Sequence, residues 1–201
     1  MKGLYLVTPD WDDTQRLLAV TELALQGGVT LLQYRHKMAS ATLRLEQASV
    51  LLALCRRFGI PFIINDHVEL CLEIGADGIH VGGTDAPVAA VRAQIGPDLI
   101  LGASCYGDLE LARASHAGGA SYVAYGGFYP SRVKKYPVTT DTGILAASHA
   151  AVPLPIVVIG GMTAHNAAPL VAAGADMVAA ISSVYLADDP KQAAVAFAAL
   201  F

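Results

Sequence analysis

Short apolar runs alternate with longer amphipathic stretches along the whole chain. Each apolar run has four to six residues, many of them β-branched, which is typical of strands that are buried on both faces. The predicted strands are residues 4–7, 29–34, 61–64, 78–81, 99–103, 122–125, 156–159 and 177–180. Apolar positions at helical spacing follow each run and predict helices over residues 14–25, 41–58, 68–74, 87–94, 109–117, 142–150, 164–173 and 191–200.

Eight β-α units in series predict a closed barrel. Strands joined through helices form a parallel sheet with right-handed crossovers, and eight such units can close into a (β/α)8 TIM barrel. We expect residues 1–201 to form this barrel as a single domain. The alternative is an open, doubly wound sheet, but Thr8-Pro9-Asp10-Trp11 follows the first strand, where that fold usually carries a glycine-rich phosphate loop.

Composition and charge narrow the range of partners. Hydrophobic residues make up 54% of the 201 residues, but proline or glycine interrupts the longest apolar runs well before the roughly 18 residues of a membrane span. The first predicted strand begins at Leu4, so we expect no signal peptide and a cytoplasmic protein. A net charge of −4 does not favour binding to nucleic acid or to an anionic membrane, because both are negatively charged. Small molecules, or a second copy of the chain in a homo-oligomer, are the expected partners.

An aspartate follows each of two successive predicted strands. Asp66 comes after residues 61–64 and Asp85 comes after residues 78–81. The carboxyl ends of neighbouring parallel strands lie about 5 Å apart, so these two carboxylates can converge on one cation, as in many magnesium sites. The alternative is that each aspartate caps the helix that follows it, and Glu69 after Asp66 completes the pattern of a capping box.

Polar side chains also follow the second and fifth strands. Alternation places Gln33, Arg35 and Lys37 on one side of the second strand, where they suit a diphosphate, while His36 faces the other side and has no role on this ground. Ser104 places a hydroxyl after the fifth strand. Alternatively, Arg35 and Lys37 bind no ligand and are charged residues exposed to solvent at the end of the strand.

The later loops contain flexible and cationic residues. The loop of residues 126–142 pairs Gly126 and Gly127 with Ser131 and a run of cations, so it is either a cover over an anionic substrate or an exposed basic loop. Residues 160–163 and 181–183 are small residues that lead from the last two strands into helices, which is the usual phosphate site of such barrels. Two anionic subsites suggest a transfer reaction between two phosphorylated substrates.

Six motifs in this order resemble the thiamine-phosphate synthase family over nearly the whole chain. They are Gln33-Tyr34-Arg35-His36-Lys37, Ile64-Asn65-Asp66, residues 76–82, Tyr129-Pro130-Ser131 with Lys134-Lys135, Ile159-Gly160-Gly161-Met162 and Ile181-Ser182. The family joins an aminopyrimidine diphosphate to a thiazole phosphate, or its carboxylate, and releases pyrophosphate. The resemblance implies that the diphosphate leaves first and that the thiazole nitrogen captures the pyrimidine cation.

The resemblance also implies roles for individual residues. Asp66 and Asp85 would hold Mg²⁺. The residues implied for the pyrimidine diphosphate are Gln33, Tyr34, Arg35, His36, Lys37, Asn65, Ser104 and Lys134, of which Arg35, Ser104 and Lys134 would assist the departure of the diphosphate. Those implied for the thiazole phosphate are Ser131, Arg132, Val133, Gly161, Ile181 and Ser182.

The chain departs from the family pattern at three positions. Val133 stands where threonine is usual, Gly83 where glutamine is common and Gly127 where proline is usual. Two other functions fit much of the same pattern. A thiazole tautomerase shares the barrel but needs neither the diphosphate nor the magnesium residues, and a non-catalytic protein can bind phosphate ligands in the same fold. Pyrophosphate release distinguishes the synthase from both.

Overall fold

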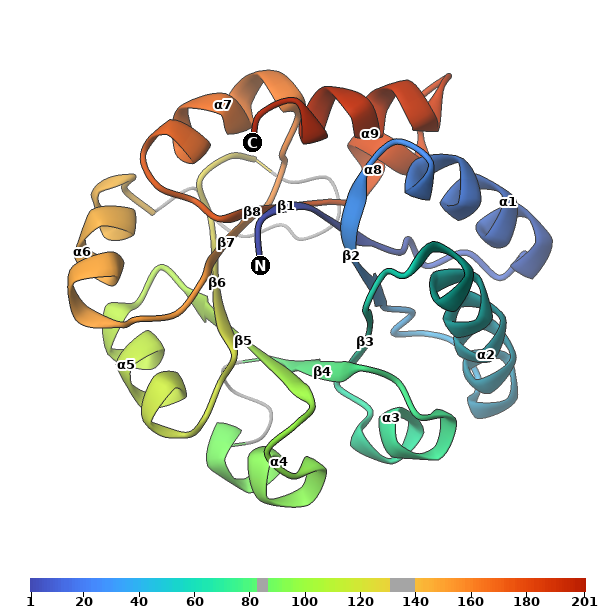
Figure 1. Ribbon diagram of the computed structural model, residues 1–201, viewed down its shortest axis with the longest axis horizontal. Helices are drawn as coiled ribbons and strands as arrows, with labels where there is room; N and C mark the ends of the chain where they lie inside the picture. Colours follow the sequence, from blue (N-terminus) through green and yellow to red (C-terminus); the bar gives the residue numbers. More distant parts are fainter. Residues whose placement is uncertain (83–86, 131–139) are drawn as a thin grey trace.

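The computed structural model describes residues 1–82, 87–130 and 140–201, and these form a closed barrel of parallel strands inside a ring of helices (Figure 1). The strands are β1 (Gly3–Val7), β2 (Val29–Tyr34), β3 (Phe62–Asn65), β4 (Gly78–Val81), β5 (Ile100–Tyr106), β6 (Tyr122–Gly126), β7 (Ile156–Ile159) and β8 (Met177–Ala180). The helices are α1 (Thr14–Leu25), α2 (Ala41–Phe58), α3 (Val68–Ile74), α4 (Val88–Ile95), α5 (Leu109–Ala117), α6 (Gly143–Ala151), α7 (Ala164–Ala172), α8 (Ser182–Tyr185) and α9 (Pro190–Ala198).

The barrel confirms the predicted fold and excludes the open sheet. The strands follow one another around the barrel in sequence order, and β1 closes it by pairing with β8, with Leu4 opposite Val178. Two local features were not predicted. Strand β5 continues to Tyr106 through a register shift after Ser104, and the short helix α8 follows β8 directly. A helix of four residues is too short for a hydrophobic period to reveal it.

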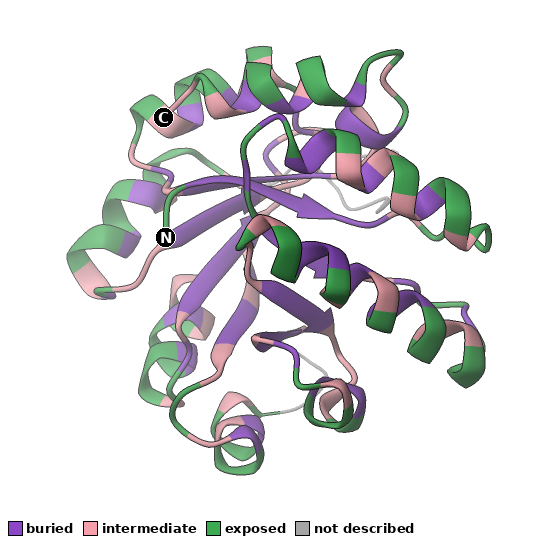
Figure 2. Cartoon of the chain, turned by 45° about the vertical axis from the view of Figure 1, so that its right-hand side comes forward, coloured by how far each residue is buried: buried purple, intermediate pink, exposed green. Residues whose placement is uncertain are grey.

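Apolar residues pack on both sides of the sheet, which explains why the strands are continuous apolar runs. One cluster fills the barrel interior and includes Tyr5, Ile63 and Met177. The other lies between the strands and the helices and includes Phe62 and Leu51. The strands are buried, whereas the helices expose their outer faces (Figure 2). This two-sided burial leaves the rims of the barrel as the places where a ligand can meet polar side chains.

Within residues 1–82, 87–130 and 140–201, none of the helices combines the length and the hydropathy that crossing a bilayer requires.

The three cysteine thiols are predicted to be unreactive in the folded protein. Cys55, Cys71 and Cys105 are buried, and burial raises the pKa of Cys55 to about 12 and the pKa of each of the other two to about 11. Since the thiolate is the nucleophile, iodoacetamide at pH 8 should modify none of them until the protein unfolds. Mass spectrometry of native and denatured protein checks this result, and modification of native protein would contradict it.

Candidate active site

A cavity of about 760 Å³ opens at the carboxyl ends of the strands. All eight strands contribute a lining residue, among them Tyr5 of β1, Gln33 of β2 and Ala179 of β8. Enzymes with this fold place their active sites at this end of the barrel, because the loops after the strands converge there. The cavity is therefore the candidate active site.

Most of the predicted site residues in the described ranges line this cavity. Those that line it are Gln33, Arg35, Lys37, Asn65, Asp66, Ser104, Gly161, Ile181 and Ser182. Asp85, Ser131, Arg132, Val133 and Lys134 lie outside the described residues. The structure therefore supports the alternation that placed Gln33, Arg35 and Lys37 on one side of β2.

The side chains of Tyr34 and His36 turn away from the cavity. The Tyr34 hydroxyl donates to Gln47 Oε1 of α2 at 2.9 Å, and His36 Nδ1 lies 3.4 Å from the same oxygen. His36 Nε2 also lies 3.4 Å from a carboxylate oxygen of Asp12. These two side chains thus anchor the strand end to the helix layer, and neither is among the residues that line the cavity.

Asp66 lines the cavity and has an unusual backbone conformation. Its φ of 63° lies in the left-handed region, which non-glycine residues rarely adopt. Asn65 Nδ2 donates to Asp66 Oδ2 at 2.6 Å, and Lys37 Nζ lies 3.6 Å from the same oxygen. The alternative of a helix cap is wrong for Asp66, because His67 occupies the N-cap position of α3 and no side chain at that position caps the helix.

The segment after β2 is held in place by residues after β1. Thr8 Oγ1 accepts from the Arg35 backbone N–H at 2.8 Å and donates to the Arg35 carbonyl at 3.0 Å. Asp10 Oδ1 accepts from the Lys37 backbone N–H at 3.1 Å and lies 3.5 Å from Arg35 Nη1. The Arg35 side chain is only 11% exposed. A guanidinium fixed in this way is preorganised for an anion in the cavity.

Small residues after β7 and β8 also line the cavity. The residues are Gly160, Gly161, Thr163, Ser182 and Ser183. The Ser183 hydroxyl, which lies within the predicted segment 181–183, is buried without a hydrogen-bond partner in the described structure, so it is a donor available to a ligand oxygen. Helix α8 begins at Ser182, and a helix that starts after the last strand is a common feature of the phosphate sites of other barrels.

The chain's own backbone requires glycine at position 161. Gly161 has a φ of 62°, and an added Cβ would collide with the carbonyl oxygen of Pro130. The close contact with Pro130 therefore accounts for this glycine without a ligand. Gly127, where the family usually has proline, has a φ of 86°, which a proline ring cannot adopt.

Apolar side chains lie among the polar residues of the cavity. They include Val157, Ile159, Met162, Ile181 and Leu186. An apolar wall suits flat heterocycles, whereas the polar groups suit their phosphates.

Tyr5 and His80 are lining residues that the sequence analysis left without a role. Tyr5 Oη accepts from Gln33 Nε2 at 2.6 Å, and His80 Nε2 lies 2.9 Å from Ser104 Oγ. Each therefore contacts a predicted site residue. The alternation of side chains along a strand could have identified both residues. Tyr5 lies two positions before Val7, which faces the barrel interior, and His80 follows Ile79, which faces the helices.

The closed barrel, with a polar cavity at the carboxyl ends of its strands, defines a TIM barrel whose candidate active site lies at the usual end. The family model described as thiamine monophosphate synthase matches residues 4–184. The chain belongs to this family.

Individual relatives agree with the family match. A thiamine-phosphate synthase from Janthinobacterium sp. (strain Marseille) is 70% identical over 201 residues, which is 100% of this chain and 97% of the relative. Another from Thiobacillus denitrificans is 48% identical over 99% of this chain and 94% of the relative. Among solved structures, thiamine phosphate pyrophosphorylase from Pyrococcus furiosus superposes with a TM-score of 0.85 at 31% identity, covering 98% of this chain and 94% of the other. The resemblance seen in the sequence motifs is thereby confirmed.

Proposed function

We propose that this chain is a thiamine-phosphate synthase, which couples 4-amino-2-methyl-5-hydroxymethylpyrimidine diphosphate with 4-methyl-5-(2-phosphoethyl)thiazole, or its carboxylate. The products are thiamine phosphate and pyrophosphate, with CO2 in addition from the carboxylate. The family match and relatives that carry this name over the full chain support the proposal.

The structural observation that best supports the proposal is the composition of the cavity. A single cavity combines a cationic region at Arg35 and Lys37, a separate group of hydroxyls at Ser182 and Ser183, and an apolar wall that includes Ile159. Two anionic groups and two heterocycles are the parts that the two substrates would bring. The arrangement therefore suits a reaction that holds both substrates together.

The reaction requires a leaving group to be stabilised rather than a proton to be removed. The bond between the pyrimidine methylene carbon and the diphosphate oxygen breaks, and its electron pair stays on the diphosphate. The thiazole nitrogen then gives its lone pair to the pyrimidine methylene cation and forms the new C–N bond. Arg35 and Lys37 would stabilise the negative charge that develops on the leaving group, and the Ser104 hydroxyl would donate to it.

The described residues fit a magnesium ion that is bound together with the substrate. No group of three or more His, Cys, Asp or Glu side chains capable of holding a metal occurs in residues 1–82, 87–130 and 140–201. Magnesium, however, is usually held by one or two carboxylates, with substrate phosphate and water completing its shell. Asp66, whose carboxylate lines the cavity instead of capping α3, would be one such ligand, and Asp85 would be the second. The ion, when bound, would neutralise charge on the diphosphate.

The remaining assignments stay predictions. Lys134 would bind the pyrimidine diphosphate, and residues 131–133 would bind the thiazole phosphate. Homo-oligomer formation and a cytoplasmic location also remain predictions.

The decisive experiment is turnover by the purified full-length chain. With both substrates and Mg²⁺, we expect pyrophosphate and thiamine phosphate to form in equal amounts, and omission of either substrate or of Mg²⁺ should stop both products. Interconversion of thiazole isomers without pyrophosphate would favour a tautomerase. Binding of both substrates without any product would favour a non-catalytic protein, and either result would overturn the proposal.

A further inference from the structure

A chain of hydrogen bonds crosses the barrel interior and includes residues that line the cavity. Gln33 Nε2 donates to Tyr5 Oη at 2.6 Å, and Tyr5 Oη lies 2.6 Å from Tyr122 Oη. Tyr122 Oη lies 2.9 Å from His80 Nδ1, and His80 Nε2 lies 2.9 Å from Ser104 Oγ. Five strands supply these residues, and the chain links two residues of the proposed substrate site, Gln33 and Ser104.

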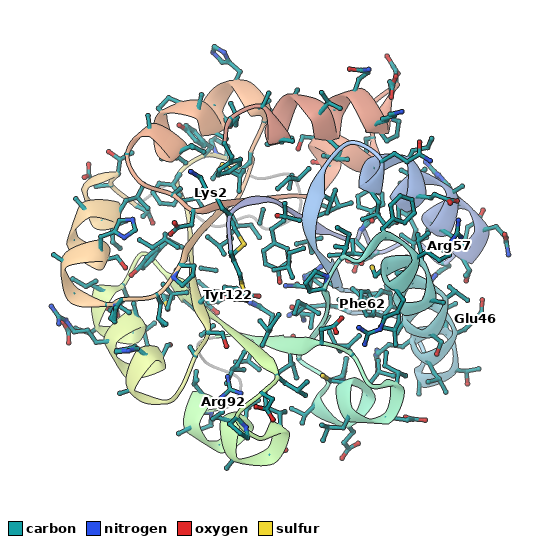
Figure 3. The ribbon with its side chains drawn as sticks, in the orientation of Figure 1. Lys2, Glu46, Arg57, Phe62, Arg92 and Tyr122 are labelled. Atoms are coloured by element: carbon teal, nitrogen blue, oxygen red, sulfur yellow. The ribbon has the colours of Figure 1, made fainter. Side chains whose placement is uncertain are left out.

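The barrel is shaped to hold Tyr122 at the middle of this chain. Tyr122 is fully buried in the barrel interior (Figure 3). Its ring stacks on His80 with centroids 5.6 Å apart and meets Tyr5 edge to face at 5.8 Å. Gly102 leaves space for this ring, because an added Cβ at that position would collide with the Tyr122 side chain. The hydroxyl is therefore fixed by packing as well as by its partners.

The chemistry of the partners gives the chain a direction. A Gln Nε2 group can only donate, so Tyr5 Oη accepts there and directs its own proton to Tyr122. Tyr122 then donates to His80 Nδ1, which leaves the ring proton on Nε2 to be donated to Ser104 Oγ. Burial raises the pKa of both tyrosines, so both hydroxyls keep the proton that this order requires.

We propose that Tyr5, Tyr122 and His80 are positioning residues that hold Ser104 as a hydrogen-bond donor toward an anionic ligand. Since Ser104 Oγ accepts from His80, its own proton is available to the cavity, which Ser104 lines. If the Gln33 amide were turned by 180°, every hydrogen bond in the chain would run in the opposite direction. The Ser104 hydroxyl would then donate its proton to His80. Ser104 would then present lone pairs to the ligand, which an anion disfavours. The choice of a diphosphate as the ligand rests on the proposed function.

The tautomer of His80 tests the direction without any substrate. In full-length protein with 15N-labelled histidine, the signals of a neutral imidazole distinguish a protonated nitrogen from an unprotonated one. The chain contains six histidines, and His80→Asn identifies the signal of this one. We expect a proton on Nε2 and none on Nδ1. A proton on Nδ1 with an unprotonated Nε2 would overturn the proposal, whether or not the protein turns over the proposed substrates.

A double-mutant cycle tests whether Tyr122 acts through Ser104. Tyr122→Phe keeps the ring and removes the link, and we expect it to lower kcat/KM for the pyrimidine diphosphate about tenfold, as for one hydrogen bond to a charged group. In a Ser104→Ala background, the same substitution should change kcat/KM less than about twofold. Equal losses in both backgrounds would overturn the proposal.

Tyr125→Phe is the matched control. Tyr125 lies on the same strand and is equally buried, but its hydroxyl donates to Ser148 Oγ at 2.9 Å in the helix layer. Its removal should lower the melting temperature without changing kcat/KM. If both variants lose kcat/KM equally, the effect of Tyr122 is general destabilisation and the proposal fails. Should Tyr122→Phe not fold, Tyr5→Phe replaces it in the cycle, because it breaks the same chain one step earlier.

Discussion

Asp66→Asn is expected to lower turnover at least about a hundredfold while leaving the protein folded and nearly as stable. The carboxylate faces the cavity and caps no helix, so its charge matters to a ligand rather than to α3. Asparagine tolerates the left-handed backbone of position 66, where φ is 63°. Pyrophosphate release at saturating substrates and a range of Mg²⁺ concentrations measures the effect, and thermal unfolding measures stability.

Two further variants distinguish the effect of the Asp66 carboxylate from the effect of the backbone conformation at that position. Asp66→Ala should lose the same activity but also about 1–2 kcal/mol of stability, because alanine is strained in the left-handed region. Glu69→Gln removes an equal charge from an exposed position in the first turn of α3 and should leave turnover unchanged. Asp85→Asn should behave as Asp66→Asn does. Normal turnover in Asp66→Asn would remove this residue from the proposed metal site.

Arg35→Gln is expected to lower turnover by about a hundred- to a thousandfold, the range for a donor aimed at developing charge. The guanidinium lines the cavity, is 11% exposed and is held near Asp10, so it is already oriented before the substrate binds. The leaving diphosphate gains charge as its bond breaks, so the loss should appear in kcat more than in KM. Single-turnover kinetics at saturating substrates shows whether bond cleavage is the step that slows.

Arg57→Gln provides the matched control for Arg35. The Arg57 side chain is 67% exposed and forms an ion pair with Glu22 at 2.8 Å on the outer surface. Exposed ion pairs of this kind contribute less than about 1 kcal/mol, so turnover should not change. A small effect of Arg35→Gln, equal to that of Arg57→Gln, would return the segment after β2 to the alternative of a solvated strand end.

The sequence determined the barrel and most of its rim. The period and the length of each hydrophobic pattern distinguish strands from helices. Strands that are buried on both faces must be apolar throughout, whereas helices that cover them must be apolar only along one stripe. Alternation likewise placed Gln33, Arg35 and Lys37 on one side of β2, since successive side chains of a strand point in opposite directions. The order of motifs along the chain was sufficient to indicate the family.

The tertiary structure decided which side chains contact one another. Sequence motifs could not show that Tyr34 and His36 turn toward Gln47, because Gln47 belongs to a separate helix. They also left Asp66 open to a capping role, which the structure excludes because His67 occupies the N-cap position of α3. The chain from Gln33 to Ser104 joins residues up to 117 positions apart, as between Tyr5 and Tyr122. Such contacts depend on closure of the barrel, which brings five strands to one interior, and no local pattern records them.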